Sequence, residues 1–199
     1  MSFQKIKDVA IALFCERGYE GASLADIAEL VGIKKSSIYN HYKNKDDLFL
    51  HIFEKSCQEE IVHVKNVLSK EKIATKEKFM KQFLTLSKNR IINNVGARFI
   101  FRFTMFPPHH FVDVLGIKIT QFMEDLHQVI FNAIEESNLF SHLSTEEFFE
   151  LASHYTILLQ GTYVEGLTHS FGMPSSKIEP AWNHFGEIFI NTANKNGFA

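Results

Sequence analysis

The sequence predicts an all-α protein, with an N-terminal three-helix helix-turn-helix module joined to a larger C-terminal helical domain. Two observations predict the helices: apolar residues recur at steps of three and four along most of the chain, and only four prolines interrupt its 199 residues. A third observation predicts the module, because short helical segments separated by a glycine-containing turn precede one long helix within the first quarter of the chain.

Composition excludes several classes of protein. With 21 basic and 23 acidic residues, a net charge of −2 rules out a surface that is basic all over. Two cysteines cannot form a disulfide framework or a cysteine zinc site. No apolar run approaches the ~20 residues of a membrane-spanning helix, and the N-terminal residues lack a signal-peptide pattern. We therefore expect a cytoplasmic protein.

The first elements are marked by their caps. Apolar spacing predicts a helix over residues 3–17, and Gly18 suits the left-handed position that follows a helix. Ser23 is a favourable N-cap for a helix over residues 24–31, with Asp26 in its first turn, and Gly32 should end that helix.

A recognition helix is expected next, over residues 35–42. Ile33 in the turn and Ile38 in the helix should both be buried. Asn44 is a suitable cap for a long helix that runs from residue 45 to about residue 68.

The rest of the chain is also predicted to be helical from residue 76 onward. Phe99, Phe101 and Phe103 alternate as in a strand, but the steps of three and four between residues 92 and 106 favour one helix, which Pro107-Pro108 ends. Further helices are expected over residues 115–134, from a capping box at 144–147 to about residue 167, and over residues 180–194.

A local cationic patch accompanies the recognition helix. Four lysines lie between residues 33 and 45 with no acidic residue among them. They are interleaved with side chains that can bind phosphates and base edges, namely Ser36, Ser37, Tyr39, Asn40, His41 and Tyr42. The alternative is a lysine-rich helix face that is merely solvated.

The motifs Gly-Tyr-Glu-Gly-Ala-Ser-Leu-Ala-Asp-Ile-Ala (18–28), Val-Gly-Ile (31–33) and Ser-Ile-Tyr-Asn-His-Tyr-Lys-Asn-Lys-Asp-Asp-Leu-Phe (37–49) resemble the N-terminal module of the TetR family of bacterial transcriptional regulators. The resemblance covers residues 3–50. Lys34 replaces the family's usual Ser or Thr, and Ser36 replaces a frequent Gly, which leaves the operator sequence open.

The resemblance implies a repressor that binds a palindromic DNA operator as a homodimer and is released by a small-molecule effector. It implies a DNA-binding domain at 1–47 and a ligand-binding and dimerisation domain at 48–199. Phosphate contacts are expected from Ser23, Tyr39, His41 and Lys45, with Lys34 as a further cation that reaches a phosphate. Base-edge contacts are expected from Lys35, Ser36, Ser37 and Asn40.

Sixteen of the 20 phenylalanines lie beyond residue 65, where they form either ordinary core or an aromatic pocket for an apolar or planar effector. The pocket candidates are Phe99, Phe103, Phe106, Phe122, Met123, Leu126, Tyr155, Leu159 and Tyr163. Arg98, Arg102 or His127 would orient a polar end of the effector, or else be exposed or ion-paired.

Dimerisation is expected to use the helix that carries Gly161 and Gly166, together with a last helix whose apolar residues are Trp182, Phe185, Ile188 and Phe189. Packing within one chain is the alternative. Neither metal, cofactor nor enzymatic activity is expected, because His109, His110 and His127 lack ligand spacing and no nucleophile or phosphate-loop motif occurs. A second hypothesis is a helical ligand-binding or interaction protein whose DNA-binding module is degenerate.

Overall fold

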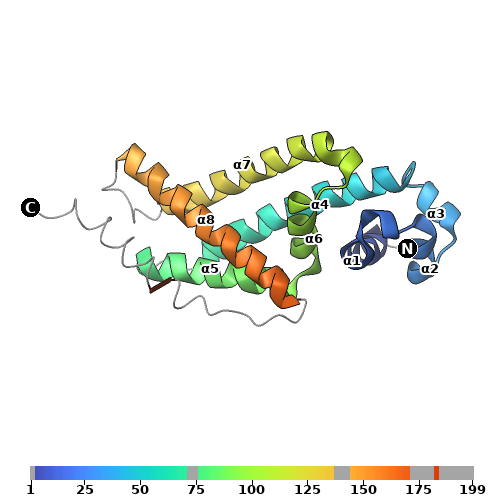
Figure 1. The fold of residues 1–199 in the computed structure, drawn as a ribbon, viewed down its shortest axis with the longest axis horizontal. Coiled ribbons are helices and arrows are strands. Elements are labelled where there is room, and N and C mark those ends of the chain that lie inside the picture. Colours follow the sequence, from blue (N-terminus) through green and yellow to red (C-terminus); the bar gives the residue numbers. More distant parts are fainter. Residues whose placement is uncertain (1–2, 71–75, 137–143, 171–181, 184–199) are drawn as a thin grey trace, which may run out of the picture. The chain divides into compact units, whose positions relative to one another are not determined.

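A computed structural model describes residues 3–70, 76–136, 144–170 and 182–183 of the chain (Figure 1). Its elements, in chain order, are α1 (Phe3–Gly21), α2 (Leu24–Val31), α3 (Lys35–Tyr39), α4 (Lys45–Lys70), α5 (Lys76–Asn93), α6 (Val95–Met105), the 3₁₀ turn η1 (His109–Phe111), α7 (Val112–Glu136) and α8 (Thr145–Ser170). The described residues contain helices and no strand, which confirms the all-α prediction. Among those helices, none is both long and apolar enough to cross a membrane.

The predicted caps of the N-terminal helices are confirmed. Gly18 has φ 74°, so the regular helix of α1 ends there although a further turn follows. Gly32 has φ 81° and ends α2. Asn44 caps α4, because its Oδ1 accepts a hydrogen bond from the Asp47 amide at 2.8 Å.

Three sequence expectations about element boundaries and burial need correction. The recognition helix α3 ends at Tyr39, three residues earlier than predicted. Ile33 is half-buried, whereas Ile38 is fully buried as expected. The helix predicted across residues 92–106 is broken at Asn94, whose side chain accepts a hydrogen bond from the Ala97 amide at 2.8 Å and so begins α6.

The later helices follow the prediction. Pro107 and Pro108 follow the end of α6, and α7 contains the predicted segment. Ser144 and Glu147 form the expected capping box of α8, with hydrogen bonds of 2.8 and 3.3 Å. The helix predicted over residues 180–194 lies outside the described residues, apart from the buried Trp182 and its neighbour Asn183.

The chain divides into two compact units, and each is considered by itself. The first unit is Met1–Val64 with Asn94–Leu126, and the second is Lys65–Asn93 with His127–Ala199. The boundary between residues 47 and 48 that the resemblance implies stays a prediction.

The core of the first unit is a cluster of phenylalanine rings. Phe49 lies at its centre, with ring centroids 5.3 Å from Phe14, 4.9 Å from Phe103 and 5.4 Å from Phe111. Phe99 is also fully buried, and its ring lies 5.0 Å from that of Phe103. Edge-to-face contacts at these distances add stability beyond the burial of apolar area. The cluster holds α1, α4 and α6 together.

In the second unit α5 packs closely on α8. A Cβ at Gly166 would lie 3.1 Å from the side chain of Ile91, so this glycine permits the approach of the two helices. Beside it, the buried Lys88 forms an ion pair with Glu165 at 2.9 Å. Gly166 therefore belongs to packing within the chain, which was the alternative to a dimer contact.

Candidate nucleic-acid interface

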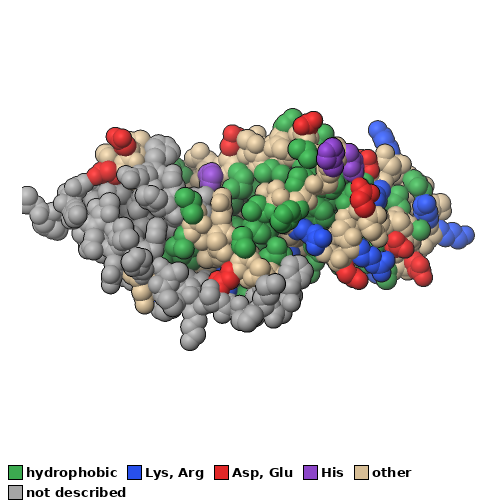
Figure 2. Space-filling model, in the orientation of Figure 1, with side chains coloured by type: hydrophobic (Ala, Val, Ile, Leu, Met, Phe, Trp, Pro, Cys, Tyr) green, Lys and Arg blue, Asp and Glu red, His purple; other side chains and the backbone are tan. Residues whose placement is uncertain are grey.

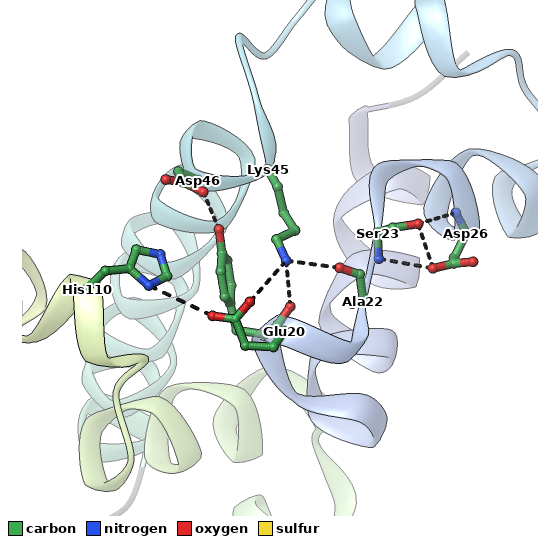
Figure 3. A network of polar contacts seen from close by, with 8 residues as sticks. Glu20, Ala22, Ser23, Asp26, Lys45, Asp46 and His110 are labelled. Carbon is green, nitrogen blue, oxygen red and sulfur yellow. Dashed lines mark hydrogen bonds and ion pairs between the residues drawn. The ribbon is translucent and has the colours of Figure 1, made fainter.

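The helix-turn-helix is fixed in place by the capping box at the start of α2. Ser23 Oγ accepts a hydrogen bond from the Asp26 amide at 3.2 Å, and the Ser23 amide donates to the Asp26 carboxylate at 3.0 Å (Figure 3). The Ser23 hydroxyl also donates to that carboxylate at 2.6 Å. These bonds from Ser23 hold the pKa of Asp26 below its usual value. The side chain of Ser23, a predicted phosphate contact, is therefore exposed but already bonded within the cap.

The recognition helix presents one polar face to solvent. Ile38 is fully buried beneath it, so the residues around Ile38 face outward. We call the following set the α3 surface: Lys34, Lys35, Ser36, Ser37, Tyr39, Asn40 and His41. All are exposed except Ser37, which is half-buried. The structure therefore brings together seven of the nine residues predicted to contact DNA.

Within the α3 surface, Lys34 occupies the N-cap position of α3 without any side-chain cap hydrogen bond. A lysine side chain has no oxygen that could accept a hydrogen bond from the first amides of the helix, unlike the Ser or Thr that is usual in the family. The ammonium of Lys35 lies 5.7 Å from the centroid of the Tyr39 ring, within the range of a cation–π contact. Tyr39 remains 49% exposed, so its phenol is available to a partner.

Tyr42 differs from its neighbours because it faces inward. It is buried, and its ring packs against Phe3 and His51 at centroid distances of 6.4 and 5.7 Å. Burial, reinforced by the charge of Asp47, raises the pKa of Tyr42 to about 12. Its amide still donates to the carbonyl of Ile38 at 3.0 Å, so Tyr42 anchors the turn that follows α3.

Lys45, the last predicted phosphate contact, is engaged within the protein (Figure 3). Its ammonium donates to the carbonyls of Tyr19 and Ala22 at 2.9 and 3.2 Å, and it lies 4.0 Å from the Glu20 carboxylate. It also lies 4.0 Å from the centroid of the Tyr19 ring. Lys45 is thus set apart from the α3 surface.

The charge around the interface is local, as the composition indicates. Figure 2 shows basic and acidic side chains interspersed over the region of α1 to α3, rather than a uniformly basic face. Lys34, Lys35 and Lys43 are exposed, so the cations of the patch are accessible. This pattern suits a contact restricted to one helix and its flanks.

The residues predicted to line an effector pocket have different environments. Phe99 and Phe103 are part of the phenylalanine core, and Phe106 is 73% exposed. Of the other candidates, Phe122, Leu126 and Leu159 are buried, Met123 and Tyr163 are half-buried, and the side chain of Tyr155 lies outside the described residues. Leu159 and Tyr163 belong to the second compact unit, whereas the candidates from Phe99 to Leu126 belong to the first.

The described residues contain no group of three or more His, Cys, Asp or Glu side chains arranged to hold a metal ion. Burial raises the pKa of Cys15 to about 11 and that of Cys57 to about 12, so both remain protonated thiols at neutral pH. A protonated thiol is a poor nucleophile.

Sequence reasoning missed two polar contacts near this interface. Arg102 of α6 donates from Nη1 to the carbonyl of Cys15 at 2.9 Å. The hydroxyl of the buried Tyr19 donates to the carboxylate of Asp46. The pKa of Tyr19 is raised mainly by burial and further by this hydrogen bond. No local pattern could reveal either pair, because the partners lie 87 and 27 residues apart in sequence.

Comparison with known proteins finds sequence relatives for the N-terminal part of the chain. Residues 6–52 match the family described as "Bacterial regulatory proteins, tetR family". A 45-residue segment is 53% identical to the biofilm operon icaADBC HTH-type negative transcriptional regulator IcaR of Staphylococcus epidermidis, and 51% identical to IcaR of Staphylococcus aureus strain Newman. Each match covers 23% of this chain and 24% of the relative, so the chain matches about a quarter of these relatives' length.

Solved structures show that the likeness of fold extends further. The chain is similar to a cysteine mutant of the TetR family transcriptional regulator CifR complexed with 26bp double-strand operator DNA, with a TM-score of 0.66 and 16% identity over 98% of this chain and 96% of that one. It is also similar to the transcriptional regulator FadR of Bacillus subtilis in complex with stearoyl-CoA, with a TM-score of 0.64 and 13% identity over 96% and 99% of the two chains. At these identities the likeness establishes the fold.

Proposed function

We propose, because residues 6–52 match the family described as "Bacterial regulatory proteins, tetR family", that the chain belongs to this family and is a transcriptional repressor. In this proposal it binds a palindromic operator as a homodimer and releases the DNA when a small effector binds. The DNA-binding domain is residues 1–47, and residues 48–199 bind the effector and the second copy. As a repressor of transcription it would act in the cytoplasm.

One observation carries the DNA-binding part of the proposal, namely the polar and cationic α3 surface above a fully buried Ile38. A recognition helix lies in the major groove with its N-terminal residues at the base edges. Lys35, Ser36, Ser37 and Asn40 supply donors and acceptors for those edges. Lys34, Tyr39 and His41, with Ser23 at the start of α2, are suited to the flanking phosphates.

The effector is proposed to be apolar or aromatic. The excess of phenylalanine supports this choice, and so does the FadR structure of similar fold that holds stearoyl-CoA. Because Phe99 and Phe103 are core residues, the buried or half-buried candidates Phe122, Met123 and Leu126 are the preferred members of the predicted set. Native mass spectrometry of the purified protein would reveal a co-purified effector, and adding that molecule should release bound DNA.

Repression requires sequence-specific DNA binding, which can be tested by letting the full chain select duplexes from a random-sequence pool. We expect a palindromic site that is preferred over unrelated DNA by about 10³-fold or more at physiological salt. Weak binding that ignores sequence would overturn the proposal. That result would favour the second hypothesis, a helical ligand-binding or interaction protein with a degenerate DNA-binding module.

A further inference from the structure

The C-terminal end of α1 needs hydrogen-bond donors from elsewhere in the protein. The last carbonyls of a helix have no partner within the helix, and Gly18 at φ 74° ends the regular ladder of α1. Two cationic side chains supply donors here, and neither belongs to the module α1 to α3. Arg102 of α6 reaches the carbonyl of Cys15, and Lys45 of α4 reaches the carbonyls of Tyr19 and Ala22.

The position of these cations is electrostatically favourable. The C-terminal end of a helix carries a partial negative charge, and cations are stabilised there. We call Lys45, Arg102 and their three acceptor carbonyls the α1 clamp. It holds the segment that leads directly into Ser23, the N-cap of α2.

The geometry of Lys45 leaves little of its ammonium for DNA. An ammonium has three donors. Two of them are used at 2.9 and 3.2 Å, and the Glu20 carboxylate lies 4.0 Å away on the same nitrogen. The Tyr19 ring lies 4.0 Å from that nitrogen, and the side chain is only 23% exposed. A phosphate would have to compete with contacts that already fix the fold.

We propose that Lys45 and Arg102 are positioning residues, which hold the end of α1 and thereby the α2–α3 pair, rather than contacts to the DNA backbone. The inference rests on the proposed function, because positioning matters only if α3 reads DNA. It replaces the phosphate contact that the family resemblance implies for Lys45. Arg102 would be a further residue on which the module depends, although it lies 87 positions after Cys15, whose carbonyl it holds.

The salt dependence of binding separates positioning from contact. Each phosphate that a protein neutralises contributes about 0.9 to the slope of log K against log salt concentration. Loss of a positioning residue lowers only the fraction of molecules in which α3 is correctly placed. The apparent Kd rises by the same factor by which that fraction falls, and the salt slope does not change.

The experiment uses the full chain and a duplex that the wild-type protein has selected from a random pool. We expect Lys45→Met and Arg102→Met to weaken binding about 10-fold each while the salt slope stays that of the wild type. Lys34→Met, on the exposed α3 surface, should lower the slope by about one unit per bound copy. A fall in slope for Lys45→Met equal to that for Lys34→Met would overturn the proposal.

Loss of overall stability is controlled by a variant in the other compact unit. Lys88→Met removes the buried ion pair with Glu165. It should lower the melting temperature of the protein without weakening its binding to the duplex. If Lys88→Met weakens binding as much as an α1-clamp variant of equal melting temperature does, the loss of binding reflects overall stability, and the proposed positioning role is wrong. Should Arg102→Met fail to fold, Arg102→Lys, which keeps the charge and shortens the reach, is expected to bind between wild type and Lys45→Met.

Hydrogen exchange tests the α1 clamp without DNA, so its outcome is independent of the proposed function. The amides of Ala22 and Ile27 donate to the carbonyls of Tyr19 and Ser23. Their exchange should accelerate at least several-fold in Lys45→Met and Arg102→Met, but not in Lys88→Met. Unchanged exchange in both clamp variants would show that no clamp exists, whereas failure of the wild-type chain to select any duplex would refute only the repressor.

Discussion

At the scale of single residues, Asn40 and Lys34 are expected to act differently although both lie on the α3 surface. An amide can form paired hydrogen bonds with one base edge, whereas an ammonium on a flexible stem interacts strongly with any nearby phosphate. Asn40→Ala should therefore change the preferred half-site, at a cost of about 1–3 kcal/mol for the original sequence. Repeating the duplex selection with the variant measures this change, and recovery of the wild-type half-site would contradict the assignment of Asn40 to a base edge.

The bonds between Ser23 and Asp26 make the capping box sensitive to acid. They hold the pKa of Asp26 below its usual value, so its carboxylate contributes stability that is fully present above that usual value. The contribution should be lost as the pH falls through the lowered pKa of the folded state.

Asp26→Asn tests this dependence, because it keeps the shape of the side chain and removes its charge. We expect the variant to be less stable than the wild type at pH 7, and the difference in unfolding free energy to shrink as the pH falls below about 4. Denaturant unfolding at a series of pH values measures it. A difference that is constant with pH would show that the charge of Asp26 is not what matters.

At the scale of elements, two exposed glycines are expected to respond in opposite directions to the same substitution, although neither has a neighbour within 4 Å of an added Cβ in the part of the chain that the structure describes. Gly32 has φ 81° and ends α2, so Gly32→Ala should cost about 1–2 kcal/mol of stability. Gly116 lies within α7, where Gly116→Ala should add about 0.5–1 kcal/mol. Thermal unfolding of both variants measures these two changes in stability. A loss of stability in Gly116→Ala would contradict the helix assignment there.

The same scale shows how far the sequence predicts the fold. The ends of α1 and α2 could be predicted, because Gly18, Ser23 and Gly32 act through their own backbone and their nearest neighbours. The break at Asn94 was missed because the apolar spacing continues across it, although Asn94 itself is a good cap.

The exposure of the α3 surface was predictable to a similar extent. The periodicity around Ile38 correctly predicts which face of α3 is exposed. The end of α3 and the engagement of Lys45 depend instead on partners distant in sequence, such as Phe3 for Tyr42 and Tyr19 for Lys45. Local patterns carry no information about such pairs, so the role of Lys45 required the folded structure.

At the scale of the whole molecule, the proposed homodimer rests on one face of α8. Ile157 and Val164 are 67% and 45% exposed, and Gly161 between them is exposed, with no described residue within 4 Å of an added Cβ. These residues are spaced at i, i+4 and i+7, so they share a face of the helix. A glycine flanked by exposed apolar side chains allows a second helix to approach closely. Gly161 therefore differs from Gly166, which is used by α5.

A large charged residue at this position should separate the two copies while sparing the fold of each. Among the described residues, nothing lies within 4 Å of a Cβ added at Gly161, so the melting transition of Gly161→Arg should remain cooperative. Light scattering at micromolar concentration should then report about the 22.9 kDa of one chain instead of twice that mass. Gly116→Arg, at an equally open site on α7, is the matched control and should leave the mass at that of a dimer. Because a palindromic operator is held by two recognition helices at once, the separated chain should also lose most of its affinity for the selected duplex. A dimeric mass for Gly161→Arg would place the interface elsewhere, and a monomeric wild type would remove the homodimer from the proposal.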